Sequence, residues 1–101
     1  MAGNLSAAQA KTALDSDAGI FLFDLRTEEE YNKGHIAGSI HVPSYDVKAI
    51  MHIVRSRNTK IFLYCQAGRH SASVRTALMF MGYTRVWTLG GVKDWPYGLV
   101  K

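Results

Sequence analysis

The chain contains a single cysteine, Cys65, within the stretch YCQAGRHS at residues 64–71. It follows a run of apolar, β-prone residues and is itself followed by residues that are small or flexible as far as Gly68. A lone cysteine after an apolar strand is more often a small core residue than a nucleophile, but a core residue needs no such neighbours. Gly68 permits a backbone turn that a Cβ resists, and a helix that begins near Ser71 directs its unpaired amides back toward the loop. The pattern therefore favours a reactive thiol held in a cup of backbone N–H groups.

The size of each contribution indicates which part of this cup matters. A free thiol has a pKa of about 8.5, and each unit by which a pKa falls corresponds to about 1.4 kcal/mol in favour of the anion. An exposed helix terminus supplies about 0.3–1 kcal/mol, whereas each hydrogen bond to a charged group supplies about 1.5–3 kcal/mol. Two or more amides of residues 66–71 are thus expected to be the main activating device. An exposed ion pair with the thiolate would add little stabilisation. Arg69 and His70 are therefore expected to act mostly by attracting an anionic substrate.

Strands and helices are expected to alternate along the chain and to position this loop. Short apolar runs predict strands at 20–24, 39–42, 60–64 and 85–89. Capping boxes or helical spacing predict helices that begin after Ser6 and after Thr27, at 47–54 behind a possible Ser44 cap, and at 74–81 before Gly82. This alternation predicts an α/β fold, with a small, mostly parallel sheet flanked by helices on both faces. The carboxyl ends of the strands then share one edge, where Asp24 and Cys65 are both expected.

Composition sets limits on the partners and the location of the chain. The 101 residues favour one domain over 1–101, and a net charge of +4 comes from lysines and arginines without a basic run. A solvated surface is therefore favoured over nucleic-acid binding. No apolar stretch approaches the roughly 18 residues of a membrane span, and no cysteine or histidine spacing indicates a metal site. The start, MAGNLSAAQA, lacks signal-peptide features, so a cytoplasmic location is expected, or a periplasmic one if a signal peptide has been removed.

Three motifs in order make the chain similar to a known family. YCQAGRHS resembles the active-site loop of rhodanese-type sulfurtransferases, commonly Cys-x-x-Gly-x-Arg-Ser, and above all that of single-domain thiosulfate sulfurtransferases of the phage-shock type. DLRTEEEYNKGHIAGSIHVP at 24–43 and MGYTRVWTLGGVKDW at 81–95 resemble further motifs of the family. Together these motifs cover nearly the whole chain. One departure is His70, which stands where the family often has arginine, while Arg69 precedes it.

The resemblance implies a rhodanese-like fold and a set of site residues. Cys65 is the expected catalytic nucleophile. Substrate binding is expected from the loop that follows it, namely Gln66, Ala67, Gly68, Arg69, His70 and Ser71. Supporting roles are expected for Asp24, Arg26, His35, Gly90 and Gly91. Asp24 and Arg26 are expected to fix loops, His35 to order a turn, and the two glycines to permit close packing beside the active-site loop.

The activity implied is transfer of the outer sulfur of thiosulfate to cyanide or a thiol acceptor through a Cys65 persulfide, with no cofactor and no metal. One alternative is a cysteine phosphatase or arsenate reductase, but its longer Cys-x5-Arg loop would need arginine where this chain has Ser71. Another alternative is a non-catalytic rhodanese-like module that binds proteins. The expected state is a monomer or a weak homodimer, with neither nucleic acid nor membrane as a partner.

Overall fold

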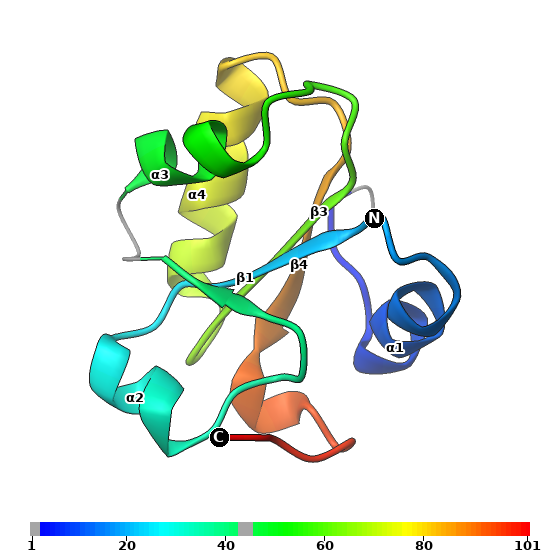
Figure 1. Cartoon of the computed structure of the whole chain (residues 1–101), viewed down its shortest axis with the longest axis vertical. Coiled ribbons are helices and arrows are strands. Elements are labelled where there is room, and N and C mark those ends of the chain that lie inside the picture. The colour runs from blue at the N-terminus through cyan, green and yellow to red at the C-terminus, as the bar shows by residue number, and fades with distance from the viewer. Residues whose placement is uncertain (1–2, 43–45) are drawn as a thin grey trace.

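The computed structural model describes residues 3–42 and 46–101, which form alternating helices and strands (Figure 1). The elements in chain order are α1 (Ala7–Ser16), β1 (Phe21–Asp24), α2 (Glu28–Lys33), β2 (Ile40–His41), α3 (Val47–Ile53), β3 (Ile61–Cys65), α4 (Arg69–Phe80), β4 (Val86–Gly91) and the 3-10 turn η1 (Val92–Asp94). Each predicted strand and helix is therefore present, with ends that differ by a few residues from the expected ones.

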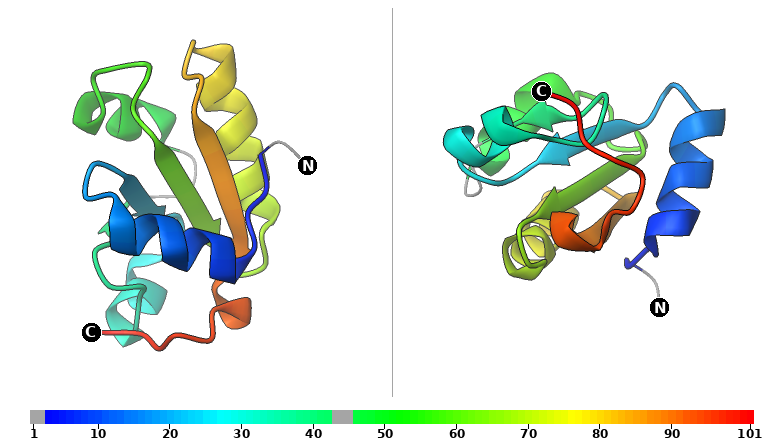
Figure 2. Two further views of the ribbon diagram at one scale, coloured as in Figure 1. Left: turned by 90° about the vertical axis from the view of Figure 1, so that its right-hand side faces the viewer. Right: turned by 90° about the horizontal axis from the view of Figure 1, so that it is seen from below.

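The four strands form one parallel sheet in the order β2-β1-β3-β4, which places β3 at the centre with a strand on either side. Buried side chains on successive residues of a strand point to opposite faces. Phe23, Ile61 and Leu63 belong to the core on the face that α3 and α4 cover, whereas Phe62 and Tyr64 pack on the other face with α1. Figure 2 shows α1 apart from α4, with the sheet between them. The predicted α/β fold with helices on both faces is confirmed.

Local signals set the helix starts. The capping boxes expected at Ser6 and Thr27 are both present, and Gly34, with a φ of 154°, ends α2. The N-cap of α3 is Asp46, whose side chain accepts a hydrogen bond from the Ala49 N–H at 2.9 Å. The expected Ser44 cap lies outside the described residues.

Both ends of the chain contact the sheet region in ways that the sequence did not predict. Near the N-terminus, the Leu5 N–H donates to the Thr88 carbonyl at 2.9 Å, so this segment extends the sheet beyond β4. Near the C-terminus, Val100 and His35 exchange two backbone hydrogen bonds of 2.8 Å each. This return of the chain ties its last residues to the loop that follows α2.

Candidate active site

Cys65 is the last residue of the central strand β3, and its side chain is 3% exposed. The Gly68 N–H donates a hydrogen bond to Cys65 Sγ at 3.0 Å. Ser71 Oγ lies 3.7 Å from the sulfur and donates its own hydrogen to the Gly68 carbonyl at 3.0 Å. Gly68 has a φ of 92°, a left-handed conformation that favours glycine. This glycine thus turns the chain sharply enough for its own amide to face the preceding cysteine.

The sequence predicted two or more loop amides around the sulfur, and that expectation is wrong in number. Within the described loop, Gly68 alone places its N–H within hydrogen-bond distance of Cys65 Sγ. α4 begins at Arg69 rather than near Ser71, so the residues after Gly68 form its first helical turn. One charge-assisted hydrogen bond is worth about 1.5–3 kcal/mol, and a helix N-terminus adds about 0.3–1 kcal/mol. An anion on this sulfur would be stabilised both by the Gly68 amide and by the start of α4.

An open cavity of about 480 Å³ lies over the cysteine. Its lining brings together most of the predicted loop and one further residue, namely Cys65, Gln66, Ala67, Arg69, His70 and Ser73. Gly68 and Ser71, which were predicted to bind substrate, are absent from this lining. Ser71 is fully buried, and its hydroxyl donates a hydrogen bond to the Gly68 carbonyl in the turn. Ser73 was missed, although helical spacing from Arg69 and His70 places it on the same side of α4.

A bulge in β4 brings the expected glycine pair beside this loop. Leu63 pairs with Thr88 but Cys65 pairs with Gly91, so β4 holds one residue more than β3 over this interval. Gly90, with a φ of 80°, occupies the irregular position. Such bulges re-aim a strand where a close approach is needed.

The close approach is between Gly91 and the backbone of the active-site loop. A Cβ built on Gly91 would lie 2.4 Å from the Gln66 carbonyl oxygen and 3.1 Å from the Ala67 Cα. A Cβ on Gly68 would likewise lie 3.3 Å from the Gly90 Cα. The backbone of the loop therefore packs directly against the backbone at the end of β4.

Asp24 and Arg26 form a buried ion pair at the carboxyl end of β1. Arg26 Nη2 lies 2.7 Å from Asp24 Oδ2 and donates a second hydrogen bond to the Gly34 carbonyl at 2.6 Å. The Tyr64 hydroxyl donates to Asp24 Oδ2 at 2.6 Å and accepts from the Ile36 N–H at 3.1 Å. These contacts attach the segment after α2 to strands β1 and β3. Tyr64 was not singled out from the sequence, where it resembles any other apolar strand residue.

The charge states of this cluster follow from its burial and its partners. Burial and the hydrogen bond to Asp24 raise the pKa of Tyr64 well above its usual value, so its hydroxyl remains a donor at neutral pH. Burial opposes the charge of Arg26, but its bonds to Asp24 outweigh that effect and raise its pKa. Arg26 therefore keeps its charge and Tyr64 stays a neutral phenol at neutral pH.

His35 orders the turn after α2 and does not line the Cys65 cavity. Its Nδ1 lies 2.9 Å from the Tyr31 carbonyl, which makes this nitrogen the donor, and its ring stacks on the Tyr31 ring at a centroid distance of 3.8 Å. Asp24 and Arg26 are likewise absent from the lining of that cavity. The structure thus separates the predicted residues into a cavity around Cys65 and a framework that supports loops.

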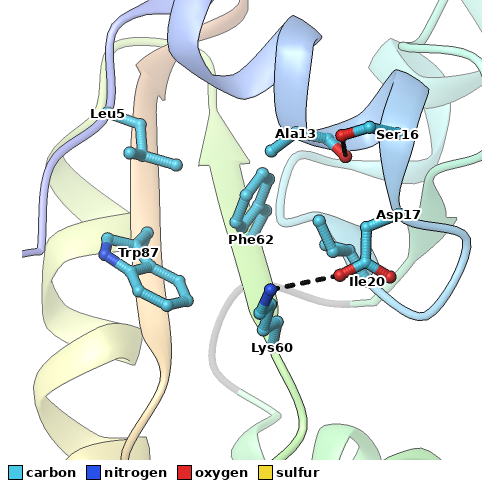
Figure 3. Close-up of a pocket in the computed structure, with 8 residues that line it drawn as sticks. All are labelled: Leu5, Ala13, Ser16, Asp17, Ile20, Lys60, Phe62 and Trp87. Atoms are coloured by element: carbon cyan, nitrogen blue, oxygen red, sulfur yellow. Dashed lines mark hydrogen bonds and ion pairs between the residues drawn. The ribbon is translucent and has the colours of Figure 1, made fainter.

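A second pocket, of about 280 Å³, lies between α1 and the sheet (Figure 3). Apolar side chains such as Leu5, Phe62 and Trp87 line it, and the ion pair between Lys60 Nζ and Asp17 Oδ2, 3.2 Å long, lies at its edge. The eight side chains in Figure 3 include neither the cysteine nor a histidine. This pocket therefore lacks the cysteine and histidine side chains that line the cavity at the end of β3.

Two further features concern metal binding and membrane-spanning helices. Over residues 3–42 and 46–101, no group of three or more histidine, cysteine or acidic side chains is placed to hold a metal ion. In the same ranges no helix has the length and apolar character needed to cross a membrane.

Comparison with known proteins identifies the family. The rhodanese-like domain matches residues 6–96. Thiosulfate sulfurtransferase PspE of Escherichia coli (strain K12) is 40% identical over 72 residues, which cover 70% of this chain and 69% of PspE. The putative sulfur carrier protein YrkF of Bacillus subtilis (strain 168) is 31% identical over 84% of this chain, but the match spans only 46% of YrkF.

A solved structure described as a rhodanese with anions from E. coli superposes with a TM-score of 0.75 at 37% identity, covering 81% of this chain and 98% of that one. The family match spans the central cysteine strand, the loop after it and the bulged β4 strand beside that loop. The chain therefore belongs to the rhodanese-like family of sulfurtransferases.

Proposed function

We propose that this sulfurtransferase takes the outer sulfur of thiosulfate onto Cys65 and passes it to cyanide or a thiol. The observation that carries the proposal is the geometry at Cys65, whose sulfur accepts a hydrogen bond from the Gly68 N–H at the base of an open cavity. The similarity to a thiosulfate sulfurtransferase supports the choice of donor.

The first half-reaction moves one sulfur atom. The Cys65 thiolate attacks the outer sulfur of thiosulfate, the S–S bond of thiosulfate breaks, and its electron pair leaves with sulfite. The product on the enzyme is a persulfide anion. Arg69 lines the cavity with its exposed cationic side chain and attracts the dianionic donor. The Gly68 amide and the N-terminus of α4 stabilise the sulfur anion before and after transfer.

The second half-reaction restores the enzyme. Cyanide or a thiolate attacks the outer sulfur of the persulfide, the S–S bond to Cys65 breaks, and the electron pair returns to Cys65 as thiolate. Each half-reaction releases its product before the next substrate binds, so ping-pong kinetics are expected.

The phosphatase alternative receives no support from the position where it needs an arginine. That position is occupied by Ser71, which is fully buried and bonded to the Gly68 carbonyl. No guanidinium can reach a tetrahedral anion from there.

A paired assay tests the proposal. Wild-type protein is expected to form thiocyanate from thiosulfate and cyanide with parallel double-reciprocal lines, and to leave p-nitrophenyl phosphate intact. Cys65→Ser is expected to lose thiocyanate formation while it keeps the wild-type thermal transition. Turnover of thiosulfate by folded Cys65→Ser, or phosphate release by wild type, contradicts the proposal.

A further inference from the structure

A groove of about 470 Å³ is lined by residues of α3 and α4, which lie next to each other in Figure 1. We call it the α3–α4 groove, and it is lined by Val47, Lys48, Met51, Ser73, Thr76, Ala77, Phe80 and Met81. The Phe80 side chain is 90% exposed, and Met81 is 47% exposed. Exposed apolar side chains that gather around a groove mark interaction sites.

The α3–α4 groove adjoins the active-site cavity at one residue. Ser73 lines both of them. From Ser73, the groove residues of α4 follow at i+3, i+4 and i+7, which is one face of the helix and ends at Phe80. Seven residues of helix span about 10 Å. A chain that occupies the groove therefore reaches the rim of the Cys65 cavity within two helical turns.

A basic hollow adjoins the other side of the groove. This hollow, of about 390 Å³, is lined by Lys48, Met51, His52, Arg55 and Arg57, of which the first two also line the groove. Within the described part of the chain, no carboxylate lies within ion-pair distance of Lys48 or Arg55. Both charges are therefore available to a partner.

The whole segment that builds this surface lacks negative charge. Residues 47–93 contain eight lysines and arginines and neither aspartate nor glutamate, whereas the rest of the chain holds four lysines and arginines and all eight acidic residues. The net charge of +4 is therefore the sum of a charge of +8 on residues 47–93 and a charge of −4 on the rest of the chain. Of these eight cations, Lys48, Arg55 and Arg57 line the basic hollow, and positive charges gathered at one hollow steer oppositely charged partners toward it.

We propose that the α3–α4 groove and its basic hollow dock an acidic protein, with an apolar side chain of that protein in the groove and its thiol at Cys65. This inference rests on the proposed function, because the docked protein is the sulfur acceptor. The thiolate of the docked protein attacks the outer sulfur of the persulfide, and the S–S bond to Cys65 breaks. The electron pair returns to Cys65, and the partner leaves as a persulfide.

The composition of the surface favours a protein over the other candidate occupants. A nucleic acid could stack a base on Phe80, but among the side chains that line the groove Lys48 is the only charged one that could meet a phosphate. A second copy docked by the same face would bring the two basic hollows together, and like charges in contact are costly. An acidic protein can place an apolar side chain in the α3–α4 groove and its carboxylates at the basic hollow.

The test measures binding with a defined probe. The probe is a fluorescein-labelled peptide rich in glutamate, with leucines and a terminal cysteine, and its counterpart carries glutamine in place of each glutamate. Four proteins are compared, namely wild type, Phe80→Ser, K48E/R55E and the control K33E/K101E. Both double variants lower the net charge from +4 to zero, but Lys33 and Lys101 lie outside the basic segment. Fluorescence anisotropy reports binding, and thiosulfate–cyanide turnover is measured in parallel.

Wild type and K33E/K101E are expected to bind the acidic peptide roughly tenfold more tightly than its glutamine counterpart. K48E/R55E is expected to lose this preference, and Phe80→Ser to weaken binding roughly tenfold. Turnover with cyanide is expected to be the same in all four proteins. Because binding is measured without turnover, a wild type that binds the peptide but forms no thiocyanate overturns the proposed function and leaves the docking surface supported.

Four results overturn the docking proposal. The first is equal affinity of wild type for the two peptides, and the second is an affinity of Phe80→Ser for the acidic peptide as high as that of wild type. The third is loss of binding in K33E/K101E, and the fourth is tighter binding of a single-stranded RNA than of the acidic peptide by wild type. Sedimentation provides a further check, since a wild-type dimer that Phe80→Ser converts to monomer assigns the groove to a second copy and also overturns the proposal.

Discussion

A methyl group added at Gly91 is predicted to disable the active site by forcing the loop after Cys65 to move, at a cost in stability of about 1–3 kcal/mol. The backbone of Gly91 has a φ of −102°, so alanine fits there without backbone strain and the effect is steric. The new Cβ would lie 2.4 Å from the Gln66 carbonyl oxygen, about 1 Å closer than the 3.4 Å at which ordinary contacts begin. The opposing atom belongs to the backbone of the loop, so the loop as a whole must move by about that distance. A misplacement of this size costs roughly 100-fold in rate.

The assay for Gly91→Ala is steady-state transfer from thiosulfate to cyanide, with thermal unfolding recorded on the same sample. We expect kcat/KM to fall roughly 100-fold while the protein still unfolds cooperatively. Gly98→Ala is the matched control, because Gly98 has a φ of 86° and no atom within 4 Å of its built Cβ. That control is strained by about 1–2 kcal/mol but leaves the loop untouched, so it is expected to lose stability and keep its turnover. Wild-type turnover by Gly91→Ala would show that the loop position does not control catalysis.

Two further substitutions test the framework around the site. Tyr64→Phe leaves the buried Ile36 N–H without the hydroxyl that accepts its hydrogen bond, so we expect a loss of about 1–3 kcal/mol and a Tm lower by roughly 4–8 °C for each kcal/mol; an unchanged Tm contradicts this role. The hydrogen bond from the Thr27 backbone N–H lowers the pKa of the Glu30 carboxyl below its usual value of 4.5. The stability that the Glu30 carboxylate contributes is therefore complete above about pH 4.5, and it is lost as the pH falls through the lower pKa of the folded protein. Denaturant titrations are therefore expected to show a stability difference between wild type and Glu30→Gln that is constant near neutral pH and shrinks in acid, and a difference that persists in acid refutes the assignment.

The fold was predictable from the sequence because local signals agree with the tertiary structure. Apolar runs of four or five residues mark the buried strands, and the capping boxes at Ser6 and Thr27 start α1 and α2 as expected. The position of Cys65 at the carboxyl edge of the central strand follows from the same pattern. Periodicity and capping are local properties, so one sequence is enough to identify them.

The parts that were not predicted depend on contacts between distant segments. The hydrogen bond from the Gly68 N–H to Cys65 Sγ depends on the left-handed conformation of Gly68, which directly precedes the first residue of α4. The role of the Tyr64 hydroxyl depends on Asp24 and on Ile36, which lie 40 and 28 residues away along the chain. Such pairings carry no periodic signal.

The α3–α4 surface was missed for a different reason. The lysines and arginines form no run, whereas the informative feature is the absence of acidic residues from 47–93. That absence is visible in the sequence. Its meaning appears only when α3 and α4 bring Lys48, Arg55 and Phe80 around neighbouring hollows.

Intact-protein mass spectrometry after brief exposure to thiosulfate tests the central claim most directly, namely that Cys65 carries the transferred sulfur. We expect wild type to gain the mass of one sulfur atom, the gain to map to the peptide that contains Cys65, and cyanide to remove it. Cys65→Ser, treated in the same way, should gain nothing. A wild-type protein that turns over thiosulfate without this added sulfur, or that carries the sulfur on another residue, contradicts the account.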